Sequence, residues 1–169
     1  MTEPLKTFHA ANQTATIPIS VVARDGGLKV LQAMAAGELP GPPIAHVLNF
    51  RLTEAEEGRV VFAGTPDESH LNPLGSIHGG WTASVMDSAL ACAVMSTLVP
   101  GEGYTTVEFK VNLTRPLFPG MGEVVCEGRL VHRGKTIATS EAFLRDARGK
   151  LLAHGTETCA IFPIERLGS

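Results

Sequence analysis

The stretch GGWTASVMDSALACAVMSTL, residues 79–98, decides the fold. It is rich in Ala, Leu and Met, and Pro100 and Gly101 follow shortly after it. This composition predicts one long helix that is buried on most of its sides. Asp87 is its only charged residue. Because a carboxylate in the middle of a membrane span costs about 2.5–3.5 kcal/mol, we interpret the segment as a buried helix of a soluble domain.

Strand-like segments surround this helix. Two precede it, at residues 46–52 and 58–64, and four with a period of two follow it. The four begin near residue 106 and then cover residues 122–132, 136–145 and 150–162. In the first of the four, Val107, Phe109, Val111 and Leu113 alternate with Thr106, Glu108, Lys110 and Asn112, which predicts two opposite faces. Short turns at residues 133–135 and 147–149 predict that these four strands form an antiparallel meander.

One long apolar helix and five to six antiparallel strands have an economical packing, in which the twisted sheet wraps around the helix. The predicted fold class is therefore α+β, with the hotdog architecture. The alternative is an ordinary α+β sandwich in which the helix lies on one face of the sheet.

Residues 1–45 differ from the rest in composition, and we interpret them as an N-terminal extension of a domain that covers residues 46–165. Within the extension, residues 25–37 space Leu28, Leu31 and Met34 or Ala35 as a short amphipathic helix does, and Gly37 is a stop signal. The Pro-rich segment ELPGPPI that follows predicts a stiff connector.

Composition limits the possible functions. The 169 residues suit one domain, so an active site made from two domains needs two chains. Charged residues are 18% of the chain against about 25% in a typical soluble domain, which favours extra surface buried between subunits.

A net charge of −3 without Lys/Arg clusters argues against nucleic-acid binding. Three cysteines without CxxC spacing and six histidines without ligand spacing predict no disulfide framework and no metal site. Because the first residues do not form a signal-peptide pattern, we expect a cytoplasmic protein.

Two features could carry chemistry. The first is Asp87, which is either a catalytic base or nucleophile, or a residue on an exposed stripe of the helix; the sequence leaves both open. The second is the loop NPLGSIHGG, residues 72–80, which leads into the helix N-terminus, where free backbone N–H groups favour an oxyanion. Gly79 and Gly80 would let a substrate carbonyl approach this backbone, although a tight loop capped by His78 is the simpler interpretation of HGG alone.

His78 and Asp87 are nine positions apart. On one helix this is about 13 Å, so the two cannot meet at one reacting atom within a chain. Two helices packed antiparallel about a twofold axis would bring the loop of one chain beside the middle of the other.

The segment NPLGSIHGGWTASVMD resembles the signature of hotdog-fold acyl-CoA thioesterases of the phenylacetic-acid-pathway (PaaI) type. The likeness continues through YTTVEFKVNLTRPL and VHRGKTIATSEAFLRDARGKLLAHGTETCAIF, so it covers residues 72–162 well and residues 28–64 more loosely. The resemblance implies hydrolysis of a small or medium acyl- or aryl-CoA thioester to the free acid and CoA. It also implies a homodimer or homotetramer, no membrane partner, and no cofactor beyond the CoA of the substrate.

The resemblance also implies roles for single residues. Asp87 takes the place of the family's nucleophile or general base, facing the loop of a neighbouring subunit. The Gly79 backbone N–H polarises the thioester carbonyl, with His78 beside it and Asn72 orienting the carbonyl or the water. One threonine, either Thr106 or its neighbour Thr105, positions the water.

The same resemblance suggests contacts to the CoA half of the substrate. The turn Arg133-Gly134-Lys135 falls where relatives approach the nucleotide phosphates, and Arg115 is a weaker candidate. We expect pocket walls from Trp81 and Met86.

Three alternatives remain. A hotdog acyl-thioester dehydratase or hydratase uses His and an acid at other spacings, and a non-catalytic acyl-CoA-binding oligomer is also open. A Cys92 nucleophile has no histidine partner on its own helix, so we assign Cys92 to core packing.

Overall fold

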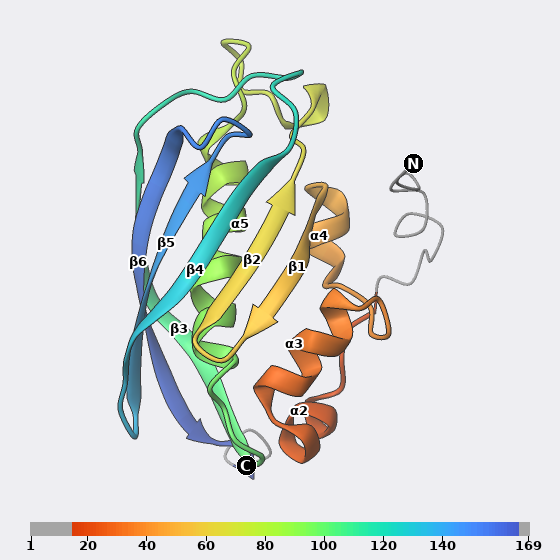
Figure 1. The fold of residues 1–169 in the computed structure, drawn as a ribbon, viewed down its shortest axis with the longest axis vertical. Coiled ribbons are helices and arrows are strands. Elements are labelled where there is room, and N and C mark those ends of the chain that lie inside the picture. The colour runs from red at the N-terminus through yellow and green to blue at the C-terminus, as the bar shows by residue number, and fades with distance from the viewer. Residues whose placement is uncertain (1–14, 166–169) are drawn as a thin grey trace.

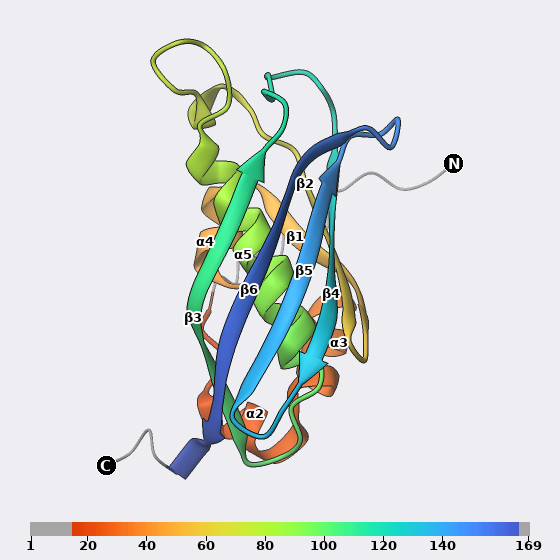
Figure 2. The same ribbon diagram turned by 90° about the vertical axis from the view of Figure 1, so that its left-hand side faces the viewer.

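The computed structural model describes residues 15–165. An antiparallel six-stranded sheet curls around one long helix, α5 (Figures 1 and 2). The strand order is β1-β2-β4-β5-β6-β3. The strands are β1 (Phe50–Glu56), β2 (Arg59–Gly64), β3 (Glu102–Leu113), β4 (Val124–Arg133), β5 (Ile137–Arg145) and β6 (Leu151–Pro163). This arrangement confirms the predicted α+β hotdog fold.

The helix α5 (Gly79–Met95) begins where the sequence predicts and ends three residues earlier than the predicted Leu98. Its end is fixed by Ser96, whose hydroxyl donates to the Ala93 carbonyl oxygen at 2.7 Å and accepts from the Gly58 N–H at 2.8 Å. This pair of hydrogen bonds ties the C-terminus of α5 to the turn between β1 and β2.

The predicted meander is wrong for its first strand. β4, β5 and β6 are consecutive neighbours, but β3 pairs with β6 and not with β4, which instead pairs with β2. The alternation of side chains predicts each strand but carries no information on its partner. As a result β3, the second longest strand, is an edge of the sheet.

The N-terminal region holds more helix than predicted. The described helices here are α2 (Ile19–Asp25), α3 (Gly27–Ala35) and α4 (Pro43–Val47). The sequence predicts α3 with its stop at Gly37, which has a φ of 75°, but it misses α2. The predicted strand at residues 46–52 begins only at Phe50, because Pro43 starts a helical turn, a position that proline tolerates well.

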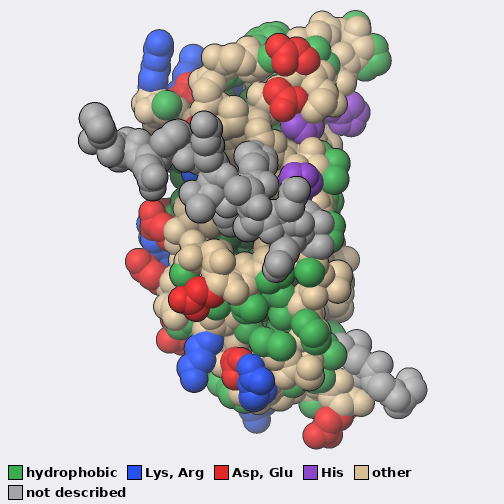
Figure 3. Space-filling model, turned by 90° about the vertical axis from the view of Figure 1, so that its right-hand side faces the viewer, with side chains coloured by type: hydrophobic (Ala, Val, Ile, Leu, Met, Phe, Trp, Pro, Cys, Tyr) green, Lys and Arg blue, Asp and Glu red, His purple; other side chains and the backbone are tan. Residues whose placement is uncertain are grey.

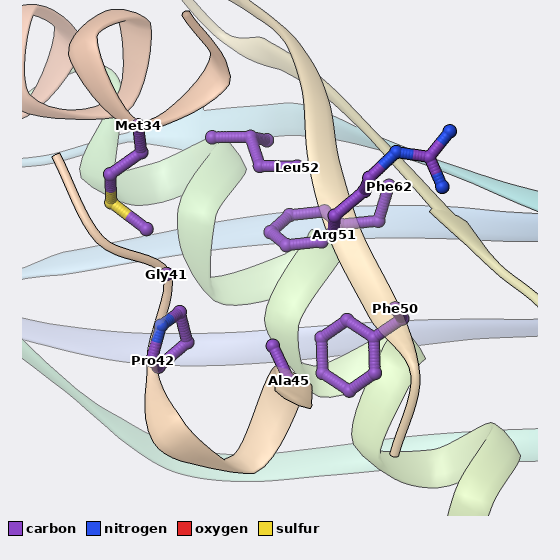
Figure 4. Close-up of a pocket in the computed structure, with 8 residues that line it drawn as sticks. All are labelled: Met34, Gly41, Pro42, Ala45, Phe50, Arg51, Leu52 and Phe62. Carbon is purple, nitrogen blue, oxygen red and sulfur yellow. The ribbon is translucent and has the colours of Figure 1, made fainter. Parts of the chain in front are cut away.

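Of these short helices, α3 and α4 pack beside β1, whereas α2 contacts α3 and β3 (Figure 1). Val30 and Leu31 of α3 are buried. Between the Pro-rich connector and the strands lies an apolar hollow, into which Met34, Phe50 and Phe62 point while Arg51 points away (Figure 4). On the outside, hydrophobic side chains gather over α2 and α3 (Figure 3). The N-terminal region therefore closes one flank of α5.

Two glycines within strands let backbones touch inside the molecule. A Cβ atom at Gly128 of β4 would lie 2.1 Å from the carbonyl oxygen of Ala89, so α5 rests directly on β4. A Cβ atom at Gly155 of β6 would lie 2.4 Å from the Lys110 carbonyl oxygen. Both contacts are with backbone, which cannot rotate away as a side chain can.

We predict that Gly128→Ala destabilises the protein by about 3 kcal/mol or more, because the methyl group forces α5 away from the sheet. Urea unfolding followed by circular dichroism measures the change. Val125→Ala, at an exposed position of the same strand, is the control and should cost less than about 1 kcal/mol. Equal stability of Gly128→Ala and the native protein would contradict the close packing.

Candidate functional site

The loop that leads into α5 is held by its own side chains. The Asn72 Oδ1 atom accepts from the backbone N–H groups of Leu74 (2.9 Å) and Ser76 (3.3 Å), and its amide nitrogen donates to the Ser76 hydroxyl (2.7 Å). Asn72 thus shapes the loop, and its side-chain amide group is occupied by hydrogen bonds within the loop.

Trp81 is part of the core and not a pocket wall. It is 2% exposed, and its indole N–H donates to the Leu48 carbonyl oxygen at 2.7 Å. Met86 is fully buried as well. The predicted pocket walls are therefore wrong, because both side chains face the sheet and not the open side of α5.

The first turn of α5 leaves one amide free. His78 is the N-cap, and its Nδ1 atom accepts from the Gly80 N–H at 2.9 Å. The Trp81 N–H donates to the His78 carbonyl oxygen at 3.0 Å. The Gly79 N–H has no acceptor among residues 15–165. Since helix N-termini carry partial positive charge, Gly79 offers a donor that an anion or oxyanion could use.

Asp87 lies on the half-open face of α5. This face also carries Ala83, Ser84 and Ser88, while Val85 and Ala89 point into the core. The two serine hydroxyls donate back to carbonyl oxygens of the helix itself, and no described residue forms a hydrogen bond or ion pair with Asp87. Burial raises the pKa of the Asp87 carboxyl. Asp87 is thus half-buried and has no partner among the described residues. This position is intermediate between a buried catalytic carboxyl and a residue on an exposed stripe of the helix.

Edge strand β3 borders the same face, and a bulge changes which of its side chains point there. The register shifts between Thr106 and Glu108. Thr106 therefore shares the inner face with Phe109 and Leu113, which corrects the predicted alternation, whereas Thr105 lies on the outer face. Phe109 and Leu113 face inward, yet they are 42% and 56% exposed. Thr106, and not Thr105, faces α5.

Gly79 and Asp87 stand on the same uninterrupted helix. The rise of α5 separates the positions by roughly 12 Å, so the structure does not bring the free amide and the carboxyl together within one chain. Thr106 lies on the inner face of β3, which borders the face of α5 that carries Asp87.

Comparison with known proteins gives the family. The sequence profile described as the thioesterase superfamily matches residues 74–153. Human acyl-coenzyme A thioesterase 13 is 33% identical over 109 residues, which is 63% of this chain and 76% of the relative. The chain belongs to the thioesterase superfamily. The predicted thioester hydrolase is thereby confirmed.

Solved structures agree with this superfamily assignment. The phenylacetic acid degradation-related protein of Ralstonia eutropha JMP134 is 27% identical, with a TM-score of 0.69 over 77% of this chain and 98% of its own. The PaaI protein of E. coli has a TM-score of 0.70 over 81% and 96%, and at 21% identity it shows the fold. The predicted resemblance to PaaI-type thioesterases is confirmed.

Two structural features are absent from residues 15–165. No helix there is both long and apolar enough for a bilayer span. In the same part of the chain, no three His, Cys, Asp or Glu side chains gather as a metal site would require.

The sequence analysis missed one residue of this thioesterase, Glu157. Its side chain is 1% exposed on the inner face of β6. One oxygen accepts from the Thr106 hydroxyl (2.8 Å) and the Cys159 thiol (3.1 Å), and the other has no partner among the described residues. Burial raises the Glu157 carboxyl pKa to about 7, and the negative charge of Asp87 adds to the rise. The only signal in the sequence is a carboxylate at an inward position of an alternating strand.

The predicted CoA contacts fall at opposite ends of the sheet. Arg133 forms an ion pair with Glu102 at the start of β3 (2.6 Å), whereas Arg115 follows the end of that strand and donates to the Leu151 carbonyl oxygen (3.2 Å). Lys135 is exposed beside Gly134 in the turn between β4 and β5. One chain therefore cannot present Arg115 and the Arg133-Gly134-Lys135 turn to the same phosphates.

The thiol of Cys92 is a poor nucleophile. Burial, together with the nearby carboxyls of Glu157 and Asp87, raises the pKa of this thiol to about 12. Almost no thiolate exists near neutral pH, which agrees with the assignment of Cys92 to packing.

We predict that Glu157 makes the protein less stable as the pH rises. The Glu157 pKa is about 7 in the folded state against an ordinary value of 4.5. Between these values the folded state keeps a proton that the unfolded state has released, so the free energy of unfolding falls, and the loss is complete above the folded pKa. Urea unfolding of the native protein and Glu157→Gln at several pH values measures this. The variant should gain stability relative to the native protein from pH 4.5 towards pH 7; parallel curves would contradict the shift.

Proposed function

We propose that this thioesterase hydrolyses acyl-CoA thioesters at a site that two copies of the chain build together. The observation that carries the proposal is the separation, on α5, of a free amide at Gly79 from an unpartnered carboxyl at Asp87. Neither group has a partner among the residues that the structure describes, and each could complete the other across a twofold axis.

The edge of the sheet supports this assembly. β3 has twelve residues and pairs on one side only, with β6. An unpaired strand of this length is a template for another strand, and exposed Phe109 and Leu113 add apolar surface beside it. If two β3 strands pair antiparallel, the loop end of one chain meets the middle and far end of the other.

The same antiparallel pairing of β3 strands also relates the predicted CoA contacts of one chain to the Gly79 amide of the other. The turn with Arg133 and Lys135 lies near the start of β3, while Gly79 lies beside Leu113 at its end. An antiparallel β3 pair brings the turn of one chain towards the Gly79 amide of the other. The lysine is the freer cation, since Arg133 is already paired with Glu102.

The proposed reaction uses few groups. The Gly79 N–H, with His78 beside it, donates to the thioester oxygen as negative charge develops there. The partner's carboxyl at position 87 either removes a proton from an attacking water or attacks the carbonyl carbon itself, and CoA leaves as the thiolate. In the second case the acyl group stays on the carboxyl as a mixed anhydride, which water then cleaves to the free acid and the carboxylate. Asn72 shapes the loop, and Gly80 lets His78 cap the helix. The reaction needs no cofactor beyond the CoA of the substrate.

We predict that Asp87→Asn lowers turnover by about 10²–10⁴-fold, the usual contribution of an acid-base group, while the dimer stays folded. A panel of aliphatic and aryl acyl-CoAs, with thiol release followed colorimetrically, measures the rate. Ser88→Ala, a neighbour on the same helix face, is the control and should keep the native rate. Product without thiol release would instead indicate a hydratase, and binding without turnover a non-catalytic protein.

Gly79→Pro tests the amide alone. Position 79 is the first of the helix, and His78 has a ψ of 136°, a conformation that suits the residue before proline. Loss of the N–H should lower turnover by about 10²–10³-fold. Gly79→Ala keeps the N–H and makes the same contact with Leu113, so it should be far more active.

Mixing the two inactive variants tests the shared site. In a mixed dimer of Asp87→Asn and Gly79→Pro, one site has both native groups and the other has neither. After exchange of subunits, random pairing should restore about one quarter of the native activity. If the mixture stays as inactive as its parts although mixed dimers form, the two groups do not act across the interface.

A further inference from the structure

Glu157 occupies an unusual position for a carboxyl group. It is 1% exposed, and the ionisable groups near it are Asp87 and Cys92 on α5, Tyr104 on β3 and Cys159 on β6, together with Glu108, which accepts from Thr158 on the outer face of the sheet. None is a cation. Its neighbour on β5, Ser140, is also buried and has no hydrogen-bond partner among the described residues. A buried acid without a positive partner costs stability, so its place in the core needs another reason.

The contact with Thr106 supplies that reason. A threonine hydroxyl has one proton to donate and two lone pairs that accept. The Thr106 proton is directed to the Glu157 oxygen at 2.8 Å. The Thr106 oxygen can then act only as an acceptor towards the space beside α5.

We propose that Glu157 is a positioning residue of the hydrolytic site, which fixes the Thr106 hydroxyl as an acceptor for the water that Asp87 activates. The inference rests on the proposed function. A water that gives one proton to the Asp87 carboxylate and the other to Thr106 turns a lone pair towards the thioester carbonyl. Without Glu157, the hydroxyl is free to rotate and donate to Asp87 itself, which occupies the carboxylate and misaligns the water.

Glu157→Leu removes the acceptor while roughly keeping the volume. We expect kcat to fall about tenfold, equivalent to about 1.4 kcal/mol, with KM changed less than about twofold. Stability should be unchanged or higher, because the variant buries no carboxyl. Glu157→Gln keeps an acceptor oxygen and should retain kcat within about threefold.

Variants at Thr106 complete a double-mutant cycle. Thr106→Val should lose kcat by a factor similar to that of Glu157→Leu, and the double variant should lose no more than either. Thr106→Ser keeps the hydroxyl and should remain near native. If Glu157→Leu does not fold, Glu157→Met, which also lacks an acceptor, takes its place in the cycle.

The outcomes are distinct. If Glu157→Leu keeps the native kcat, or if the two losses multiply in the double variant, the positioning role is overturned while Asp87-dependent turnover leaves the proposed function standing. If the native protein releases no thiol from any acyl-CoA, both proposals fall.

Discussion

A helix as apolar as α5 must be hidden from water, and the way it is hidden determines the rest of the molecule. The sheet lies so close to α5 that the Ala89 carbonyl oxygen leaves room only for a glycine, Gly128, on β4. One flank of the helix is closed by α3 and α4, which pack beside β1. The other flank, beside β3, stays half-open, and the stripe with Asp87 lies there. The side chains of Ser84, Asp87 and Ser88 therefore lie on the half-open side of α5.

The sequence predicted what local patterns encode. Composition and the flanking Pro100 and Gly101 were enough for α5, and the alternation of apolar residues was enough for β4, β5 and β6. The sequence also predicted that the sheet wraps around the helix, because few other arrangements bury so apolar a helix. The pairing of β3 with β6 is non-local, so its period of two could not reveal it. The bulge near Val107 likewise depends on the partner strand, and it moved Thr106 to the inner face.

For the candidate site, the sequence predicted most where it shows both the type of a residue and its distance from another residue along one helix. The nine-residue step from His78 to Asp87 could be converted to a distance because both lie on one helix. The free Gly79 amide agrees with the interpretation of the HGG segment, although Asn72 turned out to hold the loop. Trp81 and Met86 were misplaced because an almost wholly apolar helix does not reveal which face is open. Arg133 is a predicted phosphate contact, and the sequence did not reveal its ion pair because the partner, Glu102, lies 31 residues earlier.

The two carboxyls near the open flank show why one was foreseen and the other was not. Asp87 interrupts an apolar helix, so it stands out in any window of sequence. Glu157 sits in TETC, among polar residues of an alternating strand, where a carboxylate usually faces solvent. The alternation of β6 places it on the buried face with Cys159, and the bulge in β3 brings Thr106 beside it. Burial raises the pKa of both groups, and the charge of Asp87 raises the pKa of Glu157 further still from its ordinary value. One lies on the exposed side, where substrate can reach it, and the other lies beneath it, where it can act only through a neighbour.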